Sequence, residues 1–223
     1  MMKTFADCRL YGFVDTGYLA GRNPAEIARQ LCAGGADLIQ VRAKGASLAE
    51  VRRLTEAVLP VTRAAGVWCV LNDHAELGRE LGVPCVHLGQ ADFFDEDGAP
   101  TAAAAGFSSS VRMTKRPALG LSSHAPAEAL RAVAAGADYV AVGPVFPTGT
   151  KPGRAAVSLQ YVRWAAENLR VPWFAIGGLD LTNLEAVLAA GARRVCVVSA
   201  ILKSPDVEAT TREFKRRLVA AGQ

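Results

Sequence analysis

A chain of 223 residues, of which 51% are hydrophobic and 21% charged, has enough apolar material for a large core, and this excludes an intrinsically disordered protein. The net charge of +4 is mild and is spread along the chain, so we expect no nucleic acid as a partner. A mild positive balance favours small anionic molecules as ligands.

Short apolar runs rich in β-branched residues alternate with amphipathic stretches along the whole chain. The runs predict eight strands, at 10–15, 38–43, 68–73, 85–89, 118–123, 139–145, 172–178 and 195–200. Because these runs are apolar on both faces, we expect the strands to be covered on both sides, as in a parallel sheet.

Helical spacing fills most of the intervals between these strands. The clearest predicted helices are 24–35, 47–66, 126–136, 158–169 and 182–191, and a basic segment at 212–218 is typical of the solvated face of a last helix. The residues suited to N-capping are Asn23, Ser47 and Thr182, and the glycines suited to C-capping are Gly34, Gly66, Gly136 and Gly191.

One signature recurs where a helix leads into a strand: AGGADLI, AAGADYV and AAGARRV, with AAGVWCV as a shorter version. A reused strand–helix unit with eight strands predicts a single-domain α/β protein, a (β/α)8 (TIM) barrel over residues 1–223. The alternative is a doubly wound open sheet, which the lack of a G-x-G-x-x-G segment after the first strand disfavours. The weakest unit is the fourth, since 101–115 is its only helical stretch.

Polar residues follow the strands at the end where a barrel carries its active site. In IQVRAK, the residues Gln40, Arg42 and Lys44 occupy alternate positions, so period-2 geometry places them on one face of the second strand. A buried strand can hold such cations only beside anions or water. The pattern favours a cationic wall for a diphosphate, with salt bridges at the rim as the alternative.

Carboxylates follow the next two strands. Asn72 and Asp73 end the third strand, and Asp92 follows the fourth. Mg²⁺ is typically held by one or two carboxylates together with substrate phosphate and water. Either Asp alone would be read as a cap or a turn residue. Two of them beside a cationic strand favour a shared metal site.

The segment GPVFPTGTKPG, residues 143–153, surrounds Thr148, Thr150 and Lys151 with turn-forming residues. Hydroxyls, backbone N–H groups and a lysine suit a phosphate, although a plain loop is also rich in Gly and Pro. The seventh strand ends in Gly177–Gly178 and the eighth in Ser199, where barrels frequently bind phosphate. The glycine pair is also explained by crowding at the barrel rim. The sequence therefore predicts two anion positions at one end of the barrel.

The three histidines lack metal-site spacing. His87 lies within a strand and is expected to be a hydrogen-bonded core residue, whereas His74 is expected to open a helix. His124 follows Ser122 and Ser123 and is either a base or a backbone anchor. The acidic segment after Asp92, residues 93–101, is expected to be a solvated surface loop, with a lid as the alternative.

The start of the chain has no long apolar run and no stretch reaches ~18 uninterrupted apolar residues, so we expect neither a signal peptide nor a membrane span. The five cysteines form no C-x-x-C pair, and Cys69, Cys85 and Cys196 lie inside apolar runs. This pattern is typical of buried thiols in a reducing cytoplasm. The oligomeric state stays open, a homo-oligomer included.

Taken together, IQVRAK, LND, VHLGQAD, GLSSH, GADYVAVGPVFPTGTKPG, FAIGG and VVSAI resemble the thiamine-phosphate synthase family, in its order and spacing and over nearly the whole chain. In that family, the nitrogen of a thiazole phosphate displaces diphosphate from a hydroxymethylpyrimidine diphosphate. The resemblance implies Mg²⁺ as cofactor, two phosphorylated small molecules as substrates, and a dissociative step that needs no strong base.

The resemblance also implies roles for individual residues. It places the pyrimidine diphosphate on Gln40, Val41, Arg42, Ala43, Lys44, Asn72, Ser122 and Lys151. It places Mg²⁺ on Asp73 and Asp92, and the thiazole phosphate on Thr148, Gly149, Thr150, Gly178, Val198 and Ser199. Arg42, Lys44, Ser122 and Lys151 are the expected catalytic residues.

Two alternatives remain. The sister family of thiazole tautomerases shares the fold and implies a catalytic histidine at the position of His124, but its metal-binding acids and its loop are degraded, whereas this chain keeps both. A barrel that binds phosphate ligands without chemistry is the other, and intact metal acids argue against it.

Overall fold

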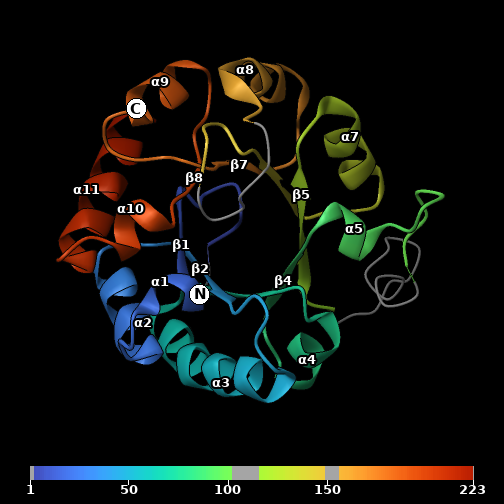
Figure 1. Ribbon diagram of the computed structural model, residues 1–223. Helices are drawn as coiled ribbons and strands as arrows, with labels where there is room; N and C mark the ends of the chain where they lie inside the picture. The colour runs from blue at the N-terminus through green and yellow to red at the C-terminus, as the bar shows by residue number, and fades with distance from the viewer. Residues whose placement is uncertain (1–2, 102–115, 149–155, 223) are drawn as a thin grey trace.

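The computed structural model describes residues 3–101, 116–148 and 156–222. Eight parallel strands follow one another in chain order and close into a barrel, because β1 pairs with both β2 and β8 (Figure 1). The strands are β1 Leu10–Asp15, β2 Leu38–Arg42, β3 Trp68–Asn72, β4 Cys85–Leu88, β5 Ala118–Ser123, β6 Tyr139–Val142, β7 Trp173–Ile176 and β8 Val195–Cys196. The predicted single-domain (β/α)8 barrel is confirmed, and the alternative of an open sheet is wrong.

The helices form a ring outside the strands (Figure 1). They are α1 Thr16–Leu19, α2 Pro24–Ala33, α3 Leu48–Ala65, α4 Ala75–Glu80, α5 Gln90–Phe93, α7 Pro126–Ala134, α8 Ser158–Asn168, α9 Leu184–Ala189, α10 Ser199–Leu202 and α11 Val207–Ala220. Among the described residues, none of these helices combines the length and apolar character that crossing a bilayer requires. Residues 102–115 of the weak fourth unit lie outside the described residues.

Side-chain caps fix where two of the predicted helices start. The oxygen of Asn23 accepts from the first turn of α2, and the hydroxyl of Ser47 does so for α3. The third predicted cap, Thr182, is wrong by one residue, because Asn183 is the N-cap of α9. Thr182 instead donates its hydroxyl proton to Asp180 within the preceding turn, at 2.6 Å.

Left-handed glycines end the helices at the recurring signature. Gly66 caps α3 at φ 66°, and Gly136 and Gly191 follow α7 and α9 at φ 85° and 102°. The C-cap of α2 is Gly34, as predicted, and the left-handed residue is the next one, Gly35, at φ 90°. The repeated glycines let each helix turn sharply back into the next strand.

The core has two parts, one between strands and helices and one inside the barrel. Cys69, Cys85 and Cys196 are buried with free thiols, as predicted, and burial raises the pKa of the Cys69 thiol to about 12. Inside the barrel, the rings of Tyr11, Tyr139 and Phe174 meet edge to face with centroids 5.4–5.9 Å apart. These rings fill part of the barrel interior, and the polar side chains of Gln40 and His87 lie against their hydroxyl groups.

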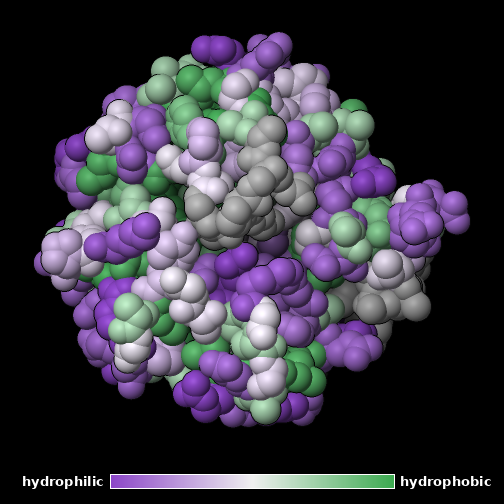
Figure 2. Space-filling view, in the orientation of Figure 1, coloured by the Kyte–Doolittle hydropathy of each residue, from purple (hydrophilic) through white to green (hydrophobic). Residues whose placement is uncertain are grey.

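Exposed apolar residues are few and scattered over the described surface. The large ones are Leu48, Leu130 and Val219, which lie on three different helices. Figure 2 shows the hydrophobic areas of this face as small and separate, with hydrophilic residues both over the outer helices and near the centre. This surface does not point to a large apolar docking face.

Candidate active site

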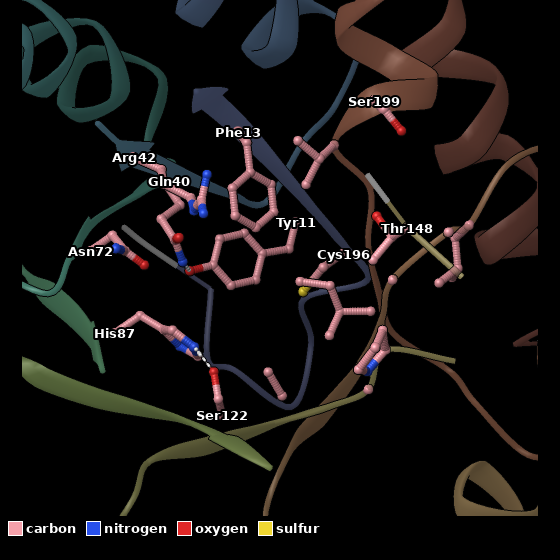
Figure 3. A pocket seen from close by; sticks show the side chains of 18 of the residues that line it. Tyr11, Phe13, Gln40, Arg42, Asn72, His87, Ser122, Thr148, Cys196 and Ser199 are labelled. Carbon is pink, nitrogen blue, oxygen red and sulfur yellow. Dashed lines mark hydrogen bonds between the residues drawn. The ribbon is translucent and has the colours of Figure 1, made fainter. Parts of the chain in front are cut away.

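Side chains from all eight strands line a cavity inside the barrel, since alternate residues of each strand point inward (Figure 3). Eight of the predicted site residues lie on this one cavity: Gln40, Arg42, Asn72, Ser122, Thr148, Gly178, Val198 and Ser199. The two predicted groups, one expected to bind the diphosphate and one the thiazole phosphate, therefore share a single cavity. Val41 lies on the other face of β2 and is only 1% exposed, so it lines no part of the cavity.

Arg42 enters the cavity from the end of β2 and is held by a carboxylate. Its Nη1 lies 2.7 Å from Oδ2 of Asp15, whose side chain is 1% exposed. The other carboxylate oxygen of Asp15 accepts from the N–H of Gly17 and so opens α1. Asp15 was not singled out from the sequence, although an Asp directly after the apolar run LYGFV was a signal.

Lys44 does not share the inward face with Gln40 and Arg42. The strand ends at Arg42, and the chain then passes through Ala43 into a turn at Gly45, φ 78°. The Lys44 side chain is 65% exposed, and its Nζ lies 3.0 Å from Oδ2 of Asp73. The alternation predicted from IQVRAK thus holds for two of the three residues, because period-2 geometry applies only while the strand continues.

Asp73 and Asp92 line a second, acidic cavity. Asp73 directly follows Asn72, which lines the first cavity. Asp73 has left-handed backbone, φ 65°, which is uncommon outside glycine and which Asp tolerates better than most residues. Oδ2 of Asp92 accepts from the N–H of Gly89 at 3.2 Å, so Asp92 also serves as a local cap. Glu76 and Glu80 line the same cavity, and its negative charge is partly compensated because Arg52 pairs with Glu80 and Lys44 with Asp73.

Both Asp side chains line one cavity, and their donor type suits a magnesium ion. Carboxylate oxygens are the donors that Mg²⁺ prefers, and a site with two of them leaves positions for phosphate oxygens and water. Among the described residues, no group of three or more His, Cys, Asp or Glu forms a complete cage for a metal. A metal at this place would therefore need ligands from a bound substrate.

The opposite side of the cavity is built from the ends of β6, β7 and β8. A Cβ on Gly177 would lie 2.4 Å from Pro144, and one on Gly178 would lie 2.6 Å from the carbonyl oxygen of Pro147. The glycine pair therefore lets the segment after β6 approach β7, and crowding does account for both residues. The predicted site residues Gly149, Thr150 and Lys151 lie outside the described residues.

Ser122 lines the cavity and is hydrogen-bonded to His87 of β4. Its Oγ is 3.0 Å from Nε2 of His87, whose Nδ1 is 3.0 Å from the hydroxyl of Tyr139 (Figure 3 shows the first of these bonds). The prediction that His87 is a hydrogen-bonded core residue is confirmed. His74 is the N-cap of α4, so it opens a helix as expected.

His124 also faces the cavity, and Glu128 holds it in place. Both its backbone N–H and its Nδ1 lie within 2.8 Å of Oε2 of Glu128, one turn along α7. This pairing fixes the ring and is compatible with both roles that the sequence left open, a backbone anchor and a base.

The acidic segment after Asp92 folds back on itself beside the barrel. Phe93 and Phe94 are buried, and the ring of Phe94 lies 4.3 Å under the guanidinium of Arg131. Phe94 bridges to Pro100, which leaves the tip between them exposed. The segment starts at the end of α5, and its acidic residues 95–97 are exposed to solvent.

Three aromatic or sulfur-bearing residues of the cavity were not predicted as site residues: Tyr11, Phe13 and Cys196. The ring of Phe13 stacks on that of Tyr11 at 5.1 Å and 13°. All three belong to apolar runs, and only closure of the barrel shows that they point inward. A flat aromatic ligand could stack on this wall.

Comparison with known proteins places the chain in a family. Residues 10–201 match the family model described as thiamine monophosphate synthase. The thiamine-phosphate synthase of Thermus thermophilus is 48% identical over 187 residues, which cover 83% of this chain and 84% of that protein. The thiamine-phosphate synthase of Acidothermus cellulolyticus is 40% identical over 223 residues, covering 99% of this chain and all of the relative (100%).

A solved structure agrees with these matches. The thiamine phosphate pyrophosphorylase from Pyrococcus furiosus superposes on the chain with a TM-score of 0.82 at 26% identity, covering 98% of this chain and 99% of the other. The fold, the length and the order of the strands therefore all correspond to one kind of transferase.

Proposed function

Because the chain belongs to the thiamine monophosphate synthase family and is a transferase, we propose that it joins a hydroxymethylpyrimidine diphosphate to a hydroxyethylthiazole phosphate. The products are thiamine phosphate and diphosphate. The observation that best supports this is the single cavity, which carries Arg42 and Asn72 on one side and Thr148, Gly178 and Ser199 on the other. Two phosphorylated partners can meet between these groups.

The diphosphate is bound at the β2 and β3 side. Arg42 keeps its guanidinium in the cavity through Asp15 and offers its remaining N–H groups to phosphate oxygens. The amide of Asn72 lies beside it, and Lys44 reaches the same edge from outside the cavity. Lys151, outside the described residues, is proposed as the further cation from the loop after β6.

Asp73 and Asp92 are the residues that would hold Mg²⁺. When bound, the ion supplies counter-charge to the diphosphate. Lys44 is paired with Asp73, one of these two carboxylates. If a cation bound there in place of Lys44, the ammonium group of Lys44 would be released to contact the diphosphate.

The proposed step is a dissociative substitution. The bond between the pyrimidine CH₂ and the diphosphate oxygen breaks, and the electron pair leaves with the diphosphate. The ring nitrogen of the thiazole then gives its lone pair to the CH₂ carbon and forms the new C–N bond. Arg42 and Lys44 meet the growing negative charge, and the cavity holds the nitrogen close to the carbon. No proton has to move, so no general base is required.

The direct test mixes the purified protein with both phosphorylated precursors and Mg²⁺ and detects thiamine phosphate by its fluorescence after oxidation. We expect product only when both precursors are present. Absence of product under these conditions would contradict the proposal. A His124→Ala variant is included because the tautomerase alternative requires this side chain, whereas the synthase requires it only as an anchor bonded to Glu128. Loss of an isomerase activity in that variant would favour the alternative.

A further inference from the structure

A continuous chain of hydrogen bonds runs along the wall of the cavity, and four of its five members line the cavity: Tyr11, Gln40, His87 and Ser122. Nε2 of Gln40 donates to the hydroxyl of Tyr11 at 2.6 Å, and that hydroxyl lies 2.9 Å from the hydroxyl of Tyr139. Tyr139 continues to Nδ1 of His87 at 3.0 Å, and Nε2 of His87 reaches Oγ of Ser122 at 3.0 Å. The ends of the chain, Gln40 and Ser122, come from strands on different sides of the barrel, β2 and β5.

The members of this chain are shielded from water. None of the five side chains belongs to a residue more than 8% exposed, and Tyr139 is fully buried. Burial raises the pKa of Tyr11 and of Tyr139 well above the usual value, so both phenols stay protonated. The bond between the two phenols is therefore one between neutral groups in a medium of low polarity, where leaving a partner unsatisfied is costly.

Gly120 shows that the packing leaves space for this chain of bonds. It lies on β5 between His87 and Tyr139 in the barrel register. A Cβ built on it would lie 2.3 Å from the Tyr139 hydroxyl and 2.6 Å from Nδ1 of His87. Any larger residue would occupy the volume in which these two groups meet.

One order of donors gives every member of the chain a partner. Gln40 donates to Tyr11, Tyr11 to Tyr139, and Tyr139 to Nδ1 of His87, so the proton of His87 is on Nε2 and is donated to Ser122. In this order, Gln40 turns its carbonyl oxygen to the cavity and Ser122 keeps its hydroxyl proton for a ligand. An aminopyrimidine carries both kinds of partner, N–H groups for the acceptor and a ring nitrogen for the donor.

We propose that Tyr11, Tyr139 and His87 are positioning residues that set which hydrogen-bonding groups Gln40 and Ser122 present to the pyrimidine. The proposal rests on the proposed function, in which those two residues contact that substrate. None of the three has to touch the reacting atoms. Their effect is on the orientation of the amide at one end of the chain and of the hydroxyl at the other.

The test compares steady-state kinetics of Tyr139→Phe with those of Tyr161→Phe. Tyr161 is the matched control, because it is a buried tyrosine whose hydroxyl lies 2.8 Å from Oγ of Ser123 and 2.9 Å from the carbonyl oxygen of Ala125, outside the chain of bonds. We expect Tyr139→Phe to lower kcat/KM for the pyrimidine diphosphate about tenfold, the effect of one unsatisfied buried group. The KM for the thiazole phosphate should change less than about twofold, because the hydrogen bond lost in Tyr139→Phe belongs to the chain that ends at the residues proposed to contact the pyrimidine.

A second pair of variants keeps the test decisive if Tyr139→Phe does not fold. His87→Leu breaks the bond to Ser122, whereas His87→Gln places an amide N–H near the position of Nε2. We expect the Gln variant to recover most of the activity that the Leu variant loses, and calorimetric binding of the pyrimidine alcohol, which lacks diphosphate, to follow the same order.

The outcomes separate the two proposals. An active wild-type protein with Tyr139→Phe indistinguishable from Tyr161→Phe, or with His87→Leu equal to His87→Gln, overturns the positioning role alone. A wild-type protein that makes no product overturns the proposed function and the positioning role with it.

Discussion

At the scale of single residues, two cations of the proposed site, Arg42 and Lys44, have carboxylate partners within the protein. Arg42 is paired with a fully buried Asp15, and Lys44 with Asp73 at the surface. Removing one partner is expected to change the free energy of unfolding differently for the two pairs. A buried charge that loses its partner is strongly destabilising, whereas an exposed pair contributes little.

Asp15→Asn should therefore destabilise the fold. The amide can still accept from Gly17 and open α1, but it leaves the guanidinium of Arg42 without its counter-charge. We expect a loss of about 3 kcal/mol in the free energy of unfolding, measured by urea denaturation. The control is Glu26→Gln, which removes an exposed pair with Arg29 on α2 and should cost less than about 1 kcal/mol. Equal losses in both variants would show that Asp15 does not balance Arg42.

Lys151→Ala should slow the chemical step. If Lys151 meets charge that grows only as diphosphate departs, its removal lowers the single-turnover rate by about 2–4 kcal/mol of transition-state stabilisation. Arg212→Ala, on the exposed side of α11, is the control for a general loss of positive charge. A single-turnover rate that matches this control would argue against the assigned role.

At the scale of elements, one buried carboxylate holds three parts of the chain together. Asp37, just before β2, accepts from Lys3 near the start of the chain and from Lys215 of α11. It also accepts from the backbone N–H groups of Arg9 and Leu10, at the start of β1. Asp138 repeats part of this pattern, since it accepts from the N–H of Leu119 in β5. The Asp of the recurring G-A-D signature thus fixes the start of the neighbouring strand.

The pKa of Asp37 predicts a pH dependence of stability. Burial by itself raises this pKa, but the bonds from Lys215, Lys3 and the two backbone N–H groups outweigh it, and the pKa lies below its ordinary value. A carboxyl whose pKa is lower in the folded than in the unfolded protein stabilises the fold above the unfolded pKa. This contribution is lost as the pH falls below about 3.9 and through the folded value.

Asp37→Asn should accordingly cost about 3 kcal/mol at pH 7, and the difference from wild type should shrink as the pH drops below about 3.9. Urea denaturation at a series of pH values measures it, with Asp97→Asn on the exposed loop after α5 as the control. A difference that stays constant down to pH 3 would mean that the charge of Asp37 does not carry the effect.

At the scale of the whole molecule, most of the barrel could be predicted from local pattern. All eight apolar runs are strands, because a parallel strand covered on both faces must be apolar along its length. The last three runs were predicted too long, since β6 ends at Val142, β7 ends at Ile176, and β8 is only Val195–Cys196 before the chain turns into α10. Strand ends depend on where the neighbouring strand stops pairing, which a single run does not show.

Contacts across the barrel could not be predicted in the same way. Arg42 and Asp15 are 27 residues apart, and Tyr11 and Tyr139 are 128 apart, so neither pair has a spacing that marks it. These contacts exist only once the strands close into a ring and set a common inward face. The polar residues after the strands could be found because the active end of a barrel is known in advance.

The measurement that tests the account most directly is the dependence of turnover on Mg²⁺ concentration in wild type and in Asp92→Asn. The account predicts that the Mg²⁺ concentration for half-maximal rate rises at least about tenfold in the variant, because one of two carboxylate ligands is lost. Glu76→Gln, in the same acidic cavity but not a proposed ligand, should shift it less than about threefold. Equal midpoints for wild type and Asp92→Asn, or full wild-type turnover in the presence of a chelator, would contradict the account.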